Sequence, residues 1–455
     1  MAEAGKAEAA EVAAVNPVSN MADEGIIIVG GGVAGMVAAR ALADAGRSVD
    51  LIEARDRLGG RVLQQRDPDW PMPIELGAEF VHGRPPPTLR LLKEAGLSLQ
   101  PVEDRHYWSG SLVPDAPVQL REVWGFNARA RRLLRSVRRD GPDCSAAEFV
   151  RRCAMHTEDR ALFELYVEGF HAAPIGDVSI QSLALDAEES SSEEPEQFRV
   201  QEGYGALVDW LAQQLAGVAA VRVHLQSVVR SVSWERGHVR VDVEQGDRSR
   251  QFEAERVLIT VPLGVLAAPS GLGIDFYPPL EQKQAAFGVC AMGHAAKVVL
   301  RFREALWAPE VSPDWQFLHD AQGSFQTFWR QCHGTAQQIT AWAGGPRARI
   351  QSVRWEATAA REVVATLSRL LGVPVERALS SLIGFQGSAF EHDPFARGAY
   401  SYVRPGGGDV HERLAEPIAD TLFFAGEATD GEFPATVAGA IQSGERAARE
   451  ISAGH

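Results

Sequence analysis

The chain has 455 residues, of which 45% are hydrophobic, so it is long enough for one or two sizeable cores and typical of a globular protein. A formal net charge of -15 argues against a nucleic-acid partner. The four cysteines lack CxxC spacing, which favours a reducing compartment and predicts neither a disulfide framework nor a metal site: Cys144, Cys153, Cys290 and Cys332.

The sequence predicts a cytoplasmic protein without a membrane partner. Residues 1–24 are rich in Ala and Glu and lack an apolar core, so we expect a disordered tail rather than a signal peptide. Apolar runs stay well short of the ~20 residues that a spanning helix needs. The sequence ends at His455, directly after its last expected helix, so we expect no membrane anchor.

Residues 25–62 predict a dinucleotide-binding βαβ unit. Four apolar residues, 26–29, are typical of a buried parallel strand and lead into GGGVAG, which contains G-x-G-x-x-G. A helical pattern follows as far as Gly46, and a second strand over residues 49–52 ends at Glu53. Strand, glycines, helix, strand and acid in this order indicate a nucleotide site, without choosing between NAD and FAD.

The residue types in this unit each have a physical reason. Gly30 allows the tight turn, Gly32 lets a pyrophosphate approach the backbone, and Gly35 lets helix and strand pack closely. The helix N-terminus faces the phosphates with unpaired N–H groups and a partial positive charge. Glu53 is expected to accept hydrogen bonds from the adenosine ribose.

The next two segments resemble the flavin amine oxidase family. Residues 55–61 (RDRLGGR) are similar to its second glycine turn, which lies along the FAD diphosphate. Residues 75–83 (ELGAEFVHG) are similar to the loop that passes the flavin ring in polyamine oxidases. The resemblance implies further cofactor contacts in both segments: Arg55, Gly60, Arg61, Gly77, Ala78 and Glu79.

The middle of the chain is more irregular. Residues 121–139 are rich in arginine and predict a solvated helix face, with a binding patch as the alternative. Residues 186–196 (DAEESSSEEPE) predict an exposed acidic loop, with a lid or a rim that attracts amines as the alternative. From residue 203 the FAD-binding character returns: a helix over 207–215 and β-rich residues 221–243. Within that β-rich stretch, Val229 matches the adenine-contacting position of the family.

Residues 256–266 then predict a buried strand and a turn, which in this family return the chain toward the flavin. Lys297 begins an alternating segment that predicts a half-buried strand, and by position alone such a lysine is an exposed edge residue. Residues 293–302, however, match the family strand whose lysine holds a water near the reactive flavin nitrogen. The resemblance implies that role for Lys297, since an ammonium beside reduced flavin stabilises developing superoxide.

The C-terminal part resembles polyamine oxidases and lysine-specific histone demethylases, through residues 393–403 (DPFARGAYSYV) and 422–444. The match implies that Tyr400 is one aromatic wall of an amine-binding cage, where a π face also favours a cation. Monoamine oxidases bond their flavin covalently through a Cys at the position that Ala399 occupies here, so non-covalent FAD is expected. The opposite wall, a tyrosine in many relatives, is Thr436, which could instead cap the following helix.

Further expectations at this end concern the cofactor. Glu427, after Gly426, matches the family residue that bonds the ribityl or phosphate region, and the helix from Val437 is expected to point its N-terminus at the pyrimidine edge of the flavin. Phe390 and Phe395 stand where relatives often carry Trp near the flavin.

The predicted fold class is α/β: a Rossmann-type FAD-binding domain with an interleaved α+β substrate domain, of the flavin amine oxidase type. After the tail of residues 1–24, the expected FAD-binding segments are 25–83, 200–305 and 395–455, and the expected substrate-binding segments are 84–199 and 306–394.

The resemblance implies hydride transfer to FAD from the carbon next to a neutral amine, hydrolysis of the imine, and reoxidation by dioxygen to hydrogen peroxide. The expected partners are thus a small-molecule amine, such as a polyamine or another amine without a carboxylate, and dioxygen.

An L-amino acid oxidase is an alternative function that Arg84 keeps open. A non-catalytic FAD-binding scaffold is another, which Lys297 and Tyr400 disfavour. Histone demethylation is disfavoured because the sequence lacks a long heptad-patterned insertion.

Overall fold

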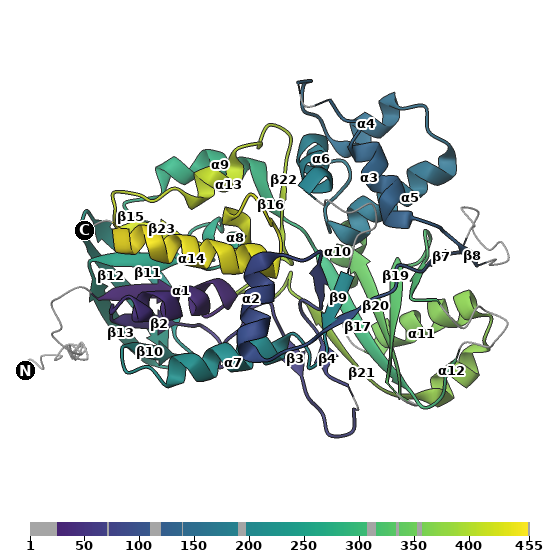
Figure 1. Ribbon diagram of the computed structural model, residues 1–455, viewed down its shortest axis with the longest axis horizontal. Helices are drawn as coiled ribbons and strands as arrows, with labels where there is room; N and C mark the ends of the chain where they lie inside the picture. Colours follow the sequence, from purple (N-terminus) through teal and green to yellow (C-terminus); the bar gives the residue numbers. More distant parts are fainter. Residues whose placement is uncertain are drawn as a thin grey trace, which may run out of the picture.

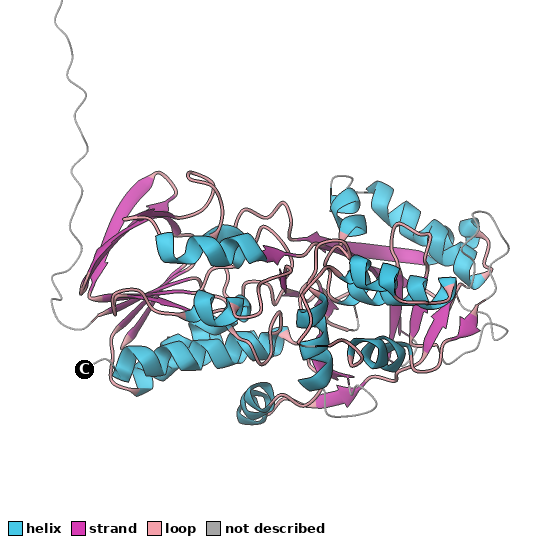
Figure 2. Cartoon of the chain, turned by 90° about the horizontal axis from the view of Figure 1, so that it is seen from above, coloured by secondary structure: helices cyan, strands magenta, loops and turns pink. Residues whose placement is uncertain are grey.

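A computed structural model of the protein describes residues 25–70, 72–109, 120–138, 140–189, 197–306, 315–333, 336–352 and 357–453. The predicted tail, residues 1–24, lies outside the described residues, as do residues 190–196 of the predicted acidic loop. Figures 1 and 2 show an elongated molecule with a β-sheet toward each end and helices packed between and around them.

The first sheet is parallel and forms the predicted dinucleotide-binding core. Its strands are, in spatial order, β10 (Val221–His224), β2 (Val49–Ile52), β1 (Ile26–Val29), β14 (Arg256–Ile259) and β23 (Leu422–Phe424). The fully apolar β1 lies in the centre, as expected for a strand that is buried on both faces. Helices α1 (Val33–Asp44), α7 (Gly205–Ala216) and α14 (Val437–Ala453) pack with one face of it in a common hydrophobic core.

A four-stranded sheet covers the other face of the parallel sheet. It consists of β13 (Arg248–Ala254), β12 (His238–Gln245), β11 (Val228–Glu235) and β15 (Asp275–Tyr277). Val232, Val239 and Val241 on its inner side pack in one cluster with Ile27 and Val29 of β1. The parallel sheet is thus enclosed between helices and a second sheet, which keeps the carboxyl ends of β1 and β2 fixed for a ligand.

The second large sheet has seven strands and lies at the right of Figure 1. The spatial order is β21 (Leu382–Ala389), β17 (Ala295–Phe302), β20 (Ala336–Gly344), β19 (Thr327–His333), β18 (Phe317–His319), β7 (His106–Trp108) and β8 (Arg121–Glu122). Alternate residues of β17, such as Val298 and Leu300, pack with Val363 and Leu367 of α11 (Ala357–Leu371). The intervening residues, including Lys297, therefore face the opposite side.

One expectation about β17 is wrong in detail. This strand lies within residues 200–305, which the sequence assigned to the FAD-binding part, and it pairs with β20 and β21 in the seven-stranded sheet. The strand was expected to be half-buried, yet only Arg301 is partly exposed, because both faces of this strand are covered. An alternating pattern predicts a strand but does not identify the strands beside it.

A helical subdomain lies above the seven-stranded sheet in Figure 1. It contains α3 (Phe126–Leu134), α4 (Ala146–Arg152), α5 (Thr157–Phe170) and α6 (Ile180–Glu189) around a separate hydrophobic cluster. Residues 186–189 form the last turn of α6 and are not part of the predicted loop, since the apolar spacing of the preceding residues extends the helix into the acidic run.

Short elements join these parts. The short strands are β3 (Gln64–Gln65), β4 (Ile74–Glu75), β5 (Phe80–His82), β6 (Leu99–Pro101), β9 (Gln197–Val200), β16 (Cys290–Met292) and β22 (Ser401–Val403). The remaining helices are α2 (Pro86–Ala95), α8 (Leu263–Leu266), η1 (Glu281–Lys283), α9 (Gln284–Val289), α10 (Pro346–Ser352), α12 (Val375–Ser381), α13 (Val410–Ala415) and η2 (Glu427–Thr429). This is the mixed α/β architecture that the sequence predicts.

Candidate active site

One continuous cavity of about 790 Å³ joins the glycine turns to the space between the seven-stranded sheet and the helical subdomain. All but one of the predicted site residues line it. The exception is Gly35, which lies behind the cavity wall and serves packing, because a Cβ there would come within 2.0 Å of the Gly30 carbonyl oxygen. We call the part at the glycine turns the cofactor end and the part beneath the helical subdomain the chamber.

The first glycine turn has the geometry that a bound diphosphate requires. Gly30 has φ +110°, and a Cβ there would lie 2.7 Å from Oγ1 of Thr260. A Cβ on Gly32, in contrast, would meet nothing within 4 Å, so the glycine leaves an open approach to the backbone. Gly32 is also the N-cap of α1 and makes no side-chain capping bond, which leaves the N–H groups of the first turn directed at the cavity.

The acid at the end of β2 is rigidly held. Glu53 accepts hydrogen bonds from the backbone N–H groups of Gly31 (2.7 Å) and Arg55 (2.9 Å). The guanidinium of Arg55 pairs with Asp393 at 2.7 Å, which ties the C-terminal segment to this wall. Val229 lines the cavity nearby.

The second glycine turn packs directly on the first. A Cβ on Gly60, which has φ +57°, would lie 3.3 Å from Cα of Gly32, so only glycine lets the two turns approach. Arg61 follows and donates hydrogen bonds to the carbonyl oxygen of Ala399 (2.9 Å) and to Glu427 (2.7 Å). The other oxygen of Glu427 accepts the Ser401 hydroxyl at 2.6 Å. These contacts join three distant segments of the chain at one wall.

The start of α14 completes the cofactor end. Gly426, Thr436 and Val437 line the cavity. The Thr436 hydroxyl accepts a hydrogen bond from the N–H of Gly439 (3.1 Å) and donates one to the carbonyl oxygen of Phe433 (2.7 Å). Thr436 therefore caps α14, which was the alternative to a cage wall, and its small side chain also borders the cavity.

Lys297 lies where the cofactor end meets the chamber. Its side chain is buried, and Nζ lies 2.6 Å from a carboxylate oxygen of Glu79 and 3.3 Å from the carbonyl oxygen of Gly77. The ammonium also lies 5.5 Å from the ring centroid of Trp329. Ala78 lies between these partners on the same loop and lines the cavity. A buried cation with a carboxylate partner thus faces the cavity at its middle.

Glu79 is engaged by more than the lysine. It accepts hydrogen bonds from Arg199 Nε (2.7 Å), Trp329 Nε1 (3.0 Å) and Gln331 Nε2 (3.1 Å). Burial raises the pKa of Glu79, but the charges and hydrogen bonds of Lys297 and Arg199 outweigh it and hold the pKa below its ordinary value. The carboxylate is therefore ionised and neutralised by two cations. It has no unpaired charge to offer to a cationic substrate.

Glu75 lies close to this pair and differs from it in protonation. Burial raises the pKa of Glu75 to about 8, against the opposing effect of Lys297, while the charge of Glu79 adds to the rise. One oxygen of Glu75 accepts the N–H of Tyr204 at 2.7 Å. At neutral pH the site therefore holds one ionised and one protonated glutamate beside Lys297.

Tyr400 borders the chamber just before β22. Its hydroxyl donates a hydrogen bond to the carbonyl oxygen of Phe170 (2.7 Å), which fixes the ring at the cavity wall. Burial raises the pKa of the Tyr400 phenol above its ordinary value, so it stays neutral. Phe390 and Phe395 also line the cavity, and the Phe395 ring lies 5.5 Å from the guanidinium carbon of Arg55.

The chamber contains residues that the sequence did not single out. They are mostly aromatic or imidazole side chains from segments far apart in the chain: Phe80, His82, His106, Phe126, Tyr166, Phe170, His171, Phe317, His319, Trp329 and Trp342. Neighbouring rings contact one another, as Tyr166 and Phe170 do at 5.5 Å. Apart from Phe80 and His82, which belong to the loop of residues 75–83, no local motif marks these positions, because the seven-stranded sheet and the helical subdomain bring them together only in the folded protein.

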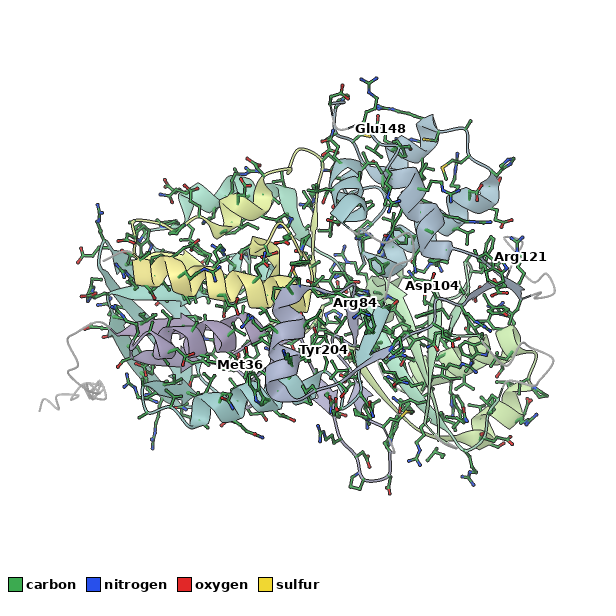
Figure 3. All side chains as sticks on the ribbon, viewed as in Figure 1. Met36, Arg84, Asp104, Arg121, Glu148 and Tyr204 are labelled. Carbon is green, nitrogen blue, oxygen red and sulfur yellow. The ribbon has the colours of Figure 1, made fainter. Side chains whose placement is uncertain are left out.

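The charged residues of the chamber are Arg84, Arg131 and Asp186. Arg84 appears between the two halves of the molecule in Figure 3, with its guanidinium carbon 4.8 Å from the ring centroid of Phe198. Arg131 belongs to α3, so the predicted solvated face of residues 121–139 is only partly exposed. Burial, reinforced by Arg131, lowers the pKa of His171 to about 3, so this imidazole is uncharged near neutral pH.

The cofactor end is a dinucleotide site of the kind that FAD-dependent oxidoreductases use, and its two glycine turns and ribose acid fit FAD. Residues 33–452 match the family model described as "Flavin containing amine oxidoreductase". The chain belongs to this family, and FAD is its cofactor.

Proteins with similar sequences include lysine-specific histone demethylases. Lysine-specific histone demethylase 2 of Homo sapiens is 27% identical over 460 residues, covering 95% of this chain and 54% of that protein. Lysine-specific histone demethylase 1 homolog 2 of Arabidopsis thaliana is 29% identical over 457 residues, covering 94% of this chain and 58% of that protein. This chain thus spans little more than half the length of these relatives.

Solved structures share the fold. A putrescine oxidase bound to putrescine superposes with a TM-score of 0.78 at 22% identity, covering 94% of this chain and 99% of that one. Cyclohexylamine oxidase from Brevibacterium oxydans IH-35A gives a TM-score of 0.76 at 21% identity, covering 95% of this chain and 99% of that one.

Among the described residues of this protein, none of the helices is both long and apolar enough to span a bilayer.

Proposed function

We propose that the protein oxidises an amine that carries no carboxylate, with FAD as hydride acceptor and dioxygen as the final acceptor. The products are an imine, which water hydrolyses, and hydrogen peroxide. The observation that carries the proposal is the buried Lys297–Glu79 pair, which faces a cavity shared by the FAD turns and an aromatic chamber.

Residues at the two ends of the cavity have different roles in this proposal. The glycine turns, Glu53 and the N-terminus of α1 hold the dinucleotide part of FAD, and Arg61 with Glu427 fixes the wall beside it. Bound FAD supplies hydride acceptance and reactivity toward dioxygen. Lys297 supplies a buried positive charge at the middle of the cavity, which stabilises negative charge that develops on oxygen.

The lining of the chamber favours a substrate in which the part of the molecule beyond the amino group is uncharged or aromatic. Tyr400, Phe170 and Tyr166 offer ring surfaces to the substrate, and Glu79 has no charge left over for a second ammonium group. Aromatic faces also bind an ammonium group as it enters. Thr436 is smaller than the tyrosine that many relatives have at this position, so it leaves room for a bulky substituent on the substrate.

An L-amino acid oxidase is the second candidate, because two guanidinium groups line the chamber. Arg84 and Arg131 are both of the type that binds a carboxylate in a bidentate manner. A histone-tail substrate is a third possibility, suggested by the names of the sequence relatives.

A peroxide assay on the purified holoenzyme tests the proposal. The panel comprises benzylamine, cyclohexylamine, putrescine, spermidine, a methylated lysine peptide and L-amino acids. Peroxide release with at least one simple amine, at a higher kcat/KM than with any amino acid, is the expected result. A clear preference for L-amino acids contradicts the proposal and directs attention to Arg84 and Arg131. A response to the methylated peptide alone favours the demethylase alternative.

A further inference from the structure

A chain of hydrogen bonds leads from the chamber to the partly exposed carboxylate of Asp104. Thr327 Oγ1 lies 3.2 Å from Nδ1 of His319, and Nε2 of His319 lies 2.7 Å from Nδ1 of His106. Nε2 of His106 lies 2.8 Å from a carboxylate oxygen of Asp104. Thr327, His319 and His106 line the cavity, and the Asp104 side chain is 28% exposed.

The inner end of this chain is in register with Lys297. Across neighbouring strands, Lys297 lies opposite Trp342, Trp342 opposite Thr327, and Thr327 opposite His319. Directly opposed residues project from the same face of a sheet, and all four line the cavity. Thr327 is thus two strands from Lys297, roughly 10 Å at ordinary strand spacing. The row starts at the site of chemistry and ends at the histidines.

The two imidazole rings meet edge to edge. Their planes differ by 3° and their centroids are 5.0 Å apart, which, with the nitrogens 2.7 Å apart, places the bond in the plane of both rings. The rings of Phe126 and Phe317 stack on His106 at 4.9 Å and 4.7 Å. This packing holds the hydrogen bonds in line and keeps water away from them.

The acceptor at the outer end sets the direction of the chain. An ionised Asp104 can only accept, so His106 donates through Nε2 and, with one proton on each ring, accepts at Nδ1 from His319. His319 then accepts the Thr327 hydroxyl proton at Nδ1. Each group in the chain can donate its proton to the next one, so a proton can be transferred along the whole chain.

We propose that Thr327, His319, His106 and Asp104 form a relay that carries a proton between the amine in the chamber and solvent. The inference rests on the proposed amine oxidation, in which the substrate arrives as an ammonium ion and must lose a proton before its carbon can release a hydride. Trp342 and the cavity-lining ring of Tyr400 carry no base for this step, and Glu79 is held by two cations.

The proton balance gives the relay a second use. The ammonium N–H bond breaks, Thr327 Oγ1 takes that proton and passes its own to His319, His319 passes its Nε2 proton to His106, and His106 passes one to Asp104 and solvent. Later, the reduction of dioxygen to hydrogen peroxide consumes one proton in addition to the hydride. One proton leaves and one returns in each turnover, so the return transfer restores the starting hydrogen-bond directions.

The surrounding charges agree with these roles. Burial, together with His106, lowers the pKa of His319 well below its ordinary value, so this ring passes a proton on without retaining it. Burial raises the pKa of Asp104, but hydrogen bonds from His106 and Asn127 and the charge of Arg131 bring it below its ordinary value. The neighbouring Asp320 is already paired with Arg369. Figure 3 shows Asp104 between the helical subdomain and the seven-stranded sheet.

The test is anaerobic stopped-flow reduction of the holoenzyme by benzylamine or putrescine, whichever reduces the wild type faster, at pH 7 and pH 10. Alkylammonium groups such as that of lysine lose their proton near ~10.4, so much of the amine arrives neutral at the higher pH. We expect His319→Gln and Thr327→Val to slow reduction about tenfold or more at pH 7, which is within the range of proton-transfer effects. At pH 10 both variants should approach the wild-type rate.

Three controls separate the relay from a structural role. His224→Gln removes another histidine that pairs with an aspartate, Asp50 at 2.8 Å, outside the cavity, and should leave both rates unchanged. Thr327→Ser should restore the rate lost in Thr327→Val, and Thr327→Val provides the test if His319→Gln does not fold. In substrate-free protein, ¹⁵N NMR should show the Nε2–H tautomer for both His106 and His319.

The outcomes are distinct. The relay would be overturned if the variants reduce their flavin as fast as the wild type at pH 7, or if their rates fall by the same factor at pH 7 and pH 10. An Nδ1–H tautomer at His106 would also overturn it. Each of these results leaves amine oxidation intact. A wild-type flavin that no amine reduces would overturn the proposed function and the relay with it.

Discussion

The two ends of the cavity are built in opposite ways. The cofactor end depends on backbone: glycines where a Cβ would collide or intrude, and the N-terminus of α1, with Glu53 held by two N–H groups. The chamber depends on side chains, mainly aromatic rings and imidazoles from strands and helices far apart in the chain. The first kind of site binds a fixed ligand through local geometry, whereas the second can change its substrate by exchanging single side chains.

The largest expected effect concerns how the cofactor end holds FAD. Ala399 lines the cavity but has no thiol, and the cysteines whose side chains the structure describes lie outside the cavity lining. Acid precipitation should therefore release all of the FAD as yellow colour in the supernatant. Colour that stays with the protein pellet would show that FAD is covalently linked, and that the cofactor end does not hold it by backbone geometry alone.

The next effect concerns Lys297, at the boundary of the two ends. Lys297→Met should retain FAD but react with dioxygen about 100-fold more slowly or worse, because a preorganised charge at a reacting centre is lost. Stopped-flow mixing of the reduced enzyme with oxygen measures this rate.

The buried pair requires a matched control for stability. Removing one partner of a buried ion pair commonly costs ~3–5 kcal/mol, although Arg199 remains beside Glu79 and reduces this cost here. Glu79→Gln is not a suitable partner substitution, because it would leave the Arg199 guanidinium without its carboxylate. Lys297→Arg keeps the positive charge and is the matched control, so it should retain more of the oxygen reaction than Lys297→Met. Reoxidation of Lys297→Met within about twofold of the wild type assigns Lys297 a structural role.

A smaller effect is expected from closing the chamber at Thr436. Thr436→Tyr should slow oxidation of bulky amines about tenfold, while slim alkylamines change by less than about threefold. The substitution also removes the hydroxyl that caps α14, a loss of ~1 kcal/mol in stability. Thr436→Ser keeps that cap without adding a wall, so it should preserve the wild-type range. Equal slowing of bulky and slim amines by Thr436→Tyr would place Thr436 away from the substrate.

The sequence predicted the two ends unequally. Gly30, Gly32 and Gly60 could be identified because the constraint on each is local: a positive φ or an open approach to the backbone. Lys297 could be identified through the resemblance, but its pairing with Glu79 could not, since those residues are 218 positions apart in the chain. For the same reason the chamber histidines were not predicted, because nothing near His106 indicates that His319 will face it.

The last effect leaves the chemistry aside: it is on stability and depends on pH. Burial raises the pKa of Glu75 to about 8 in the folded protein, against 4.5 for an ordinary glutamate. Between these values the folded state holds more protons than the unfolded chain, so the free energy of unfolding falls as pH rises through this window and levels off above it.

Glu75→Gln should remove that fall. Its stability should match the wild type near pH 4.5 and exceed it increasingly up to pH 8, by ~4–5 kcal/mol at the upper end, which a pH series of melting temperatures measures. The exposed Glu253→Gln serves as the control and should show no such trend. A Glu75→Gln profile parallel to that of the wild type would show that Glu75 is ionised in the folded protein at neutral pH.

If a single cavity brings an amine to FAD beside Lys297, the amine should reduce the flavin in the absence of oxygen, which anaerobic titration of the holoenzyme measures. Benzylamine, cyclohexylamine and putrescine are added in turn without oxygen, and the visible absorbance of FAD is recorded before and after air is admitted. At least one amine is expected to bleach the flavin, and air should restore the colour with one hydrogen peroxide formed per amine oxidised. Absorbance that no amine changes, in a protein that holds its FAD, would contradict amine oxidation at this cavity.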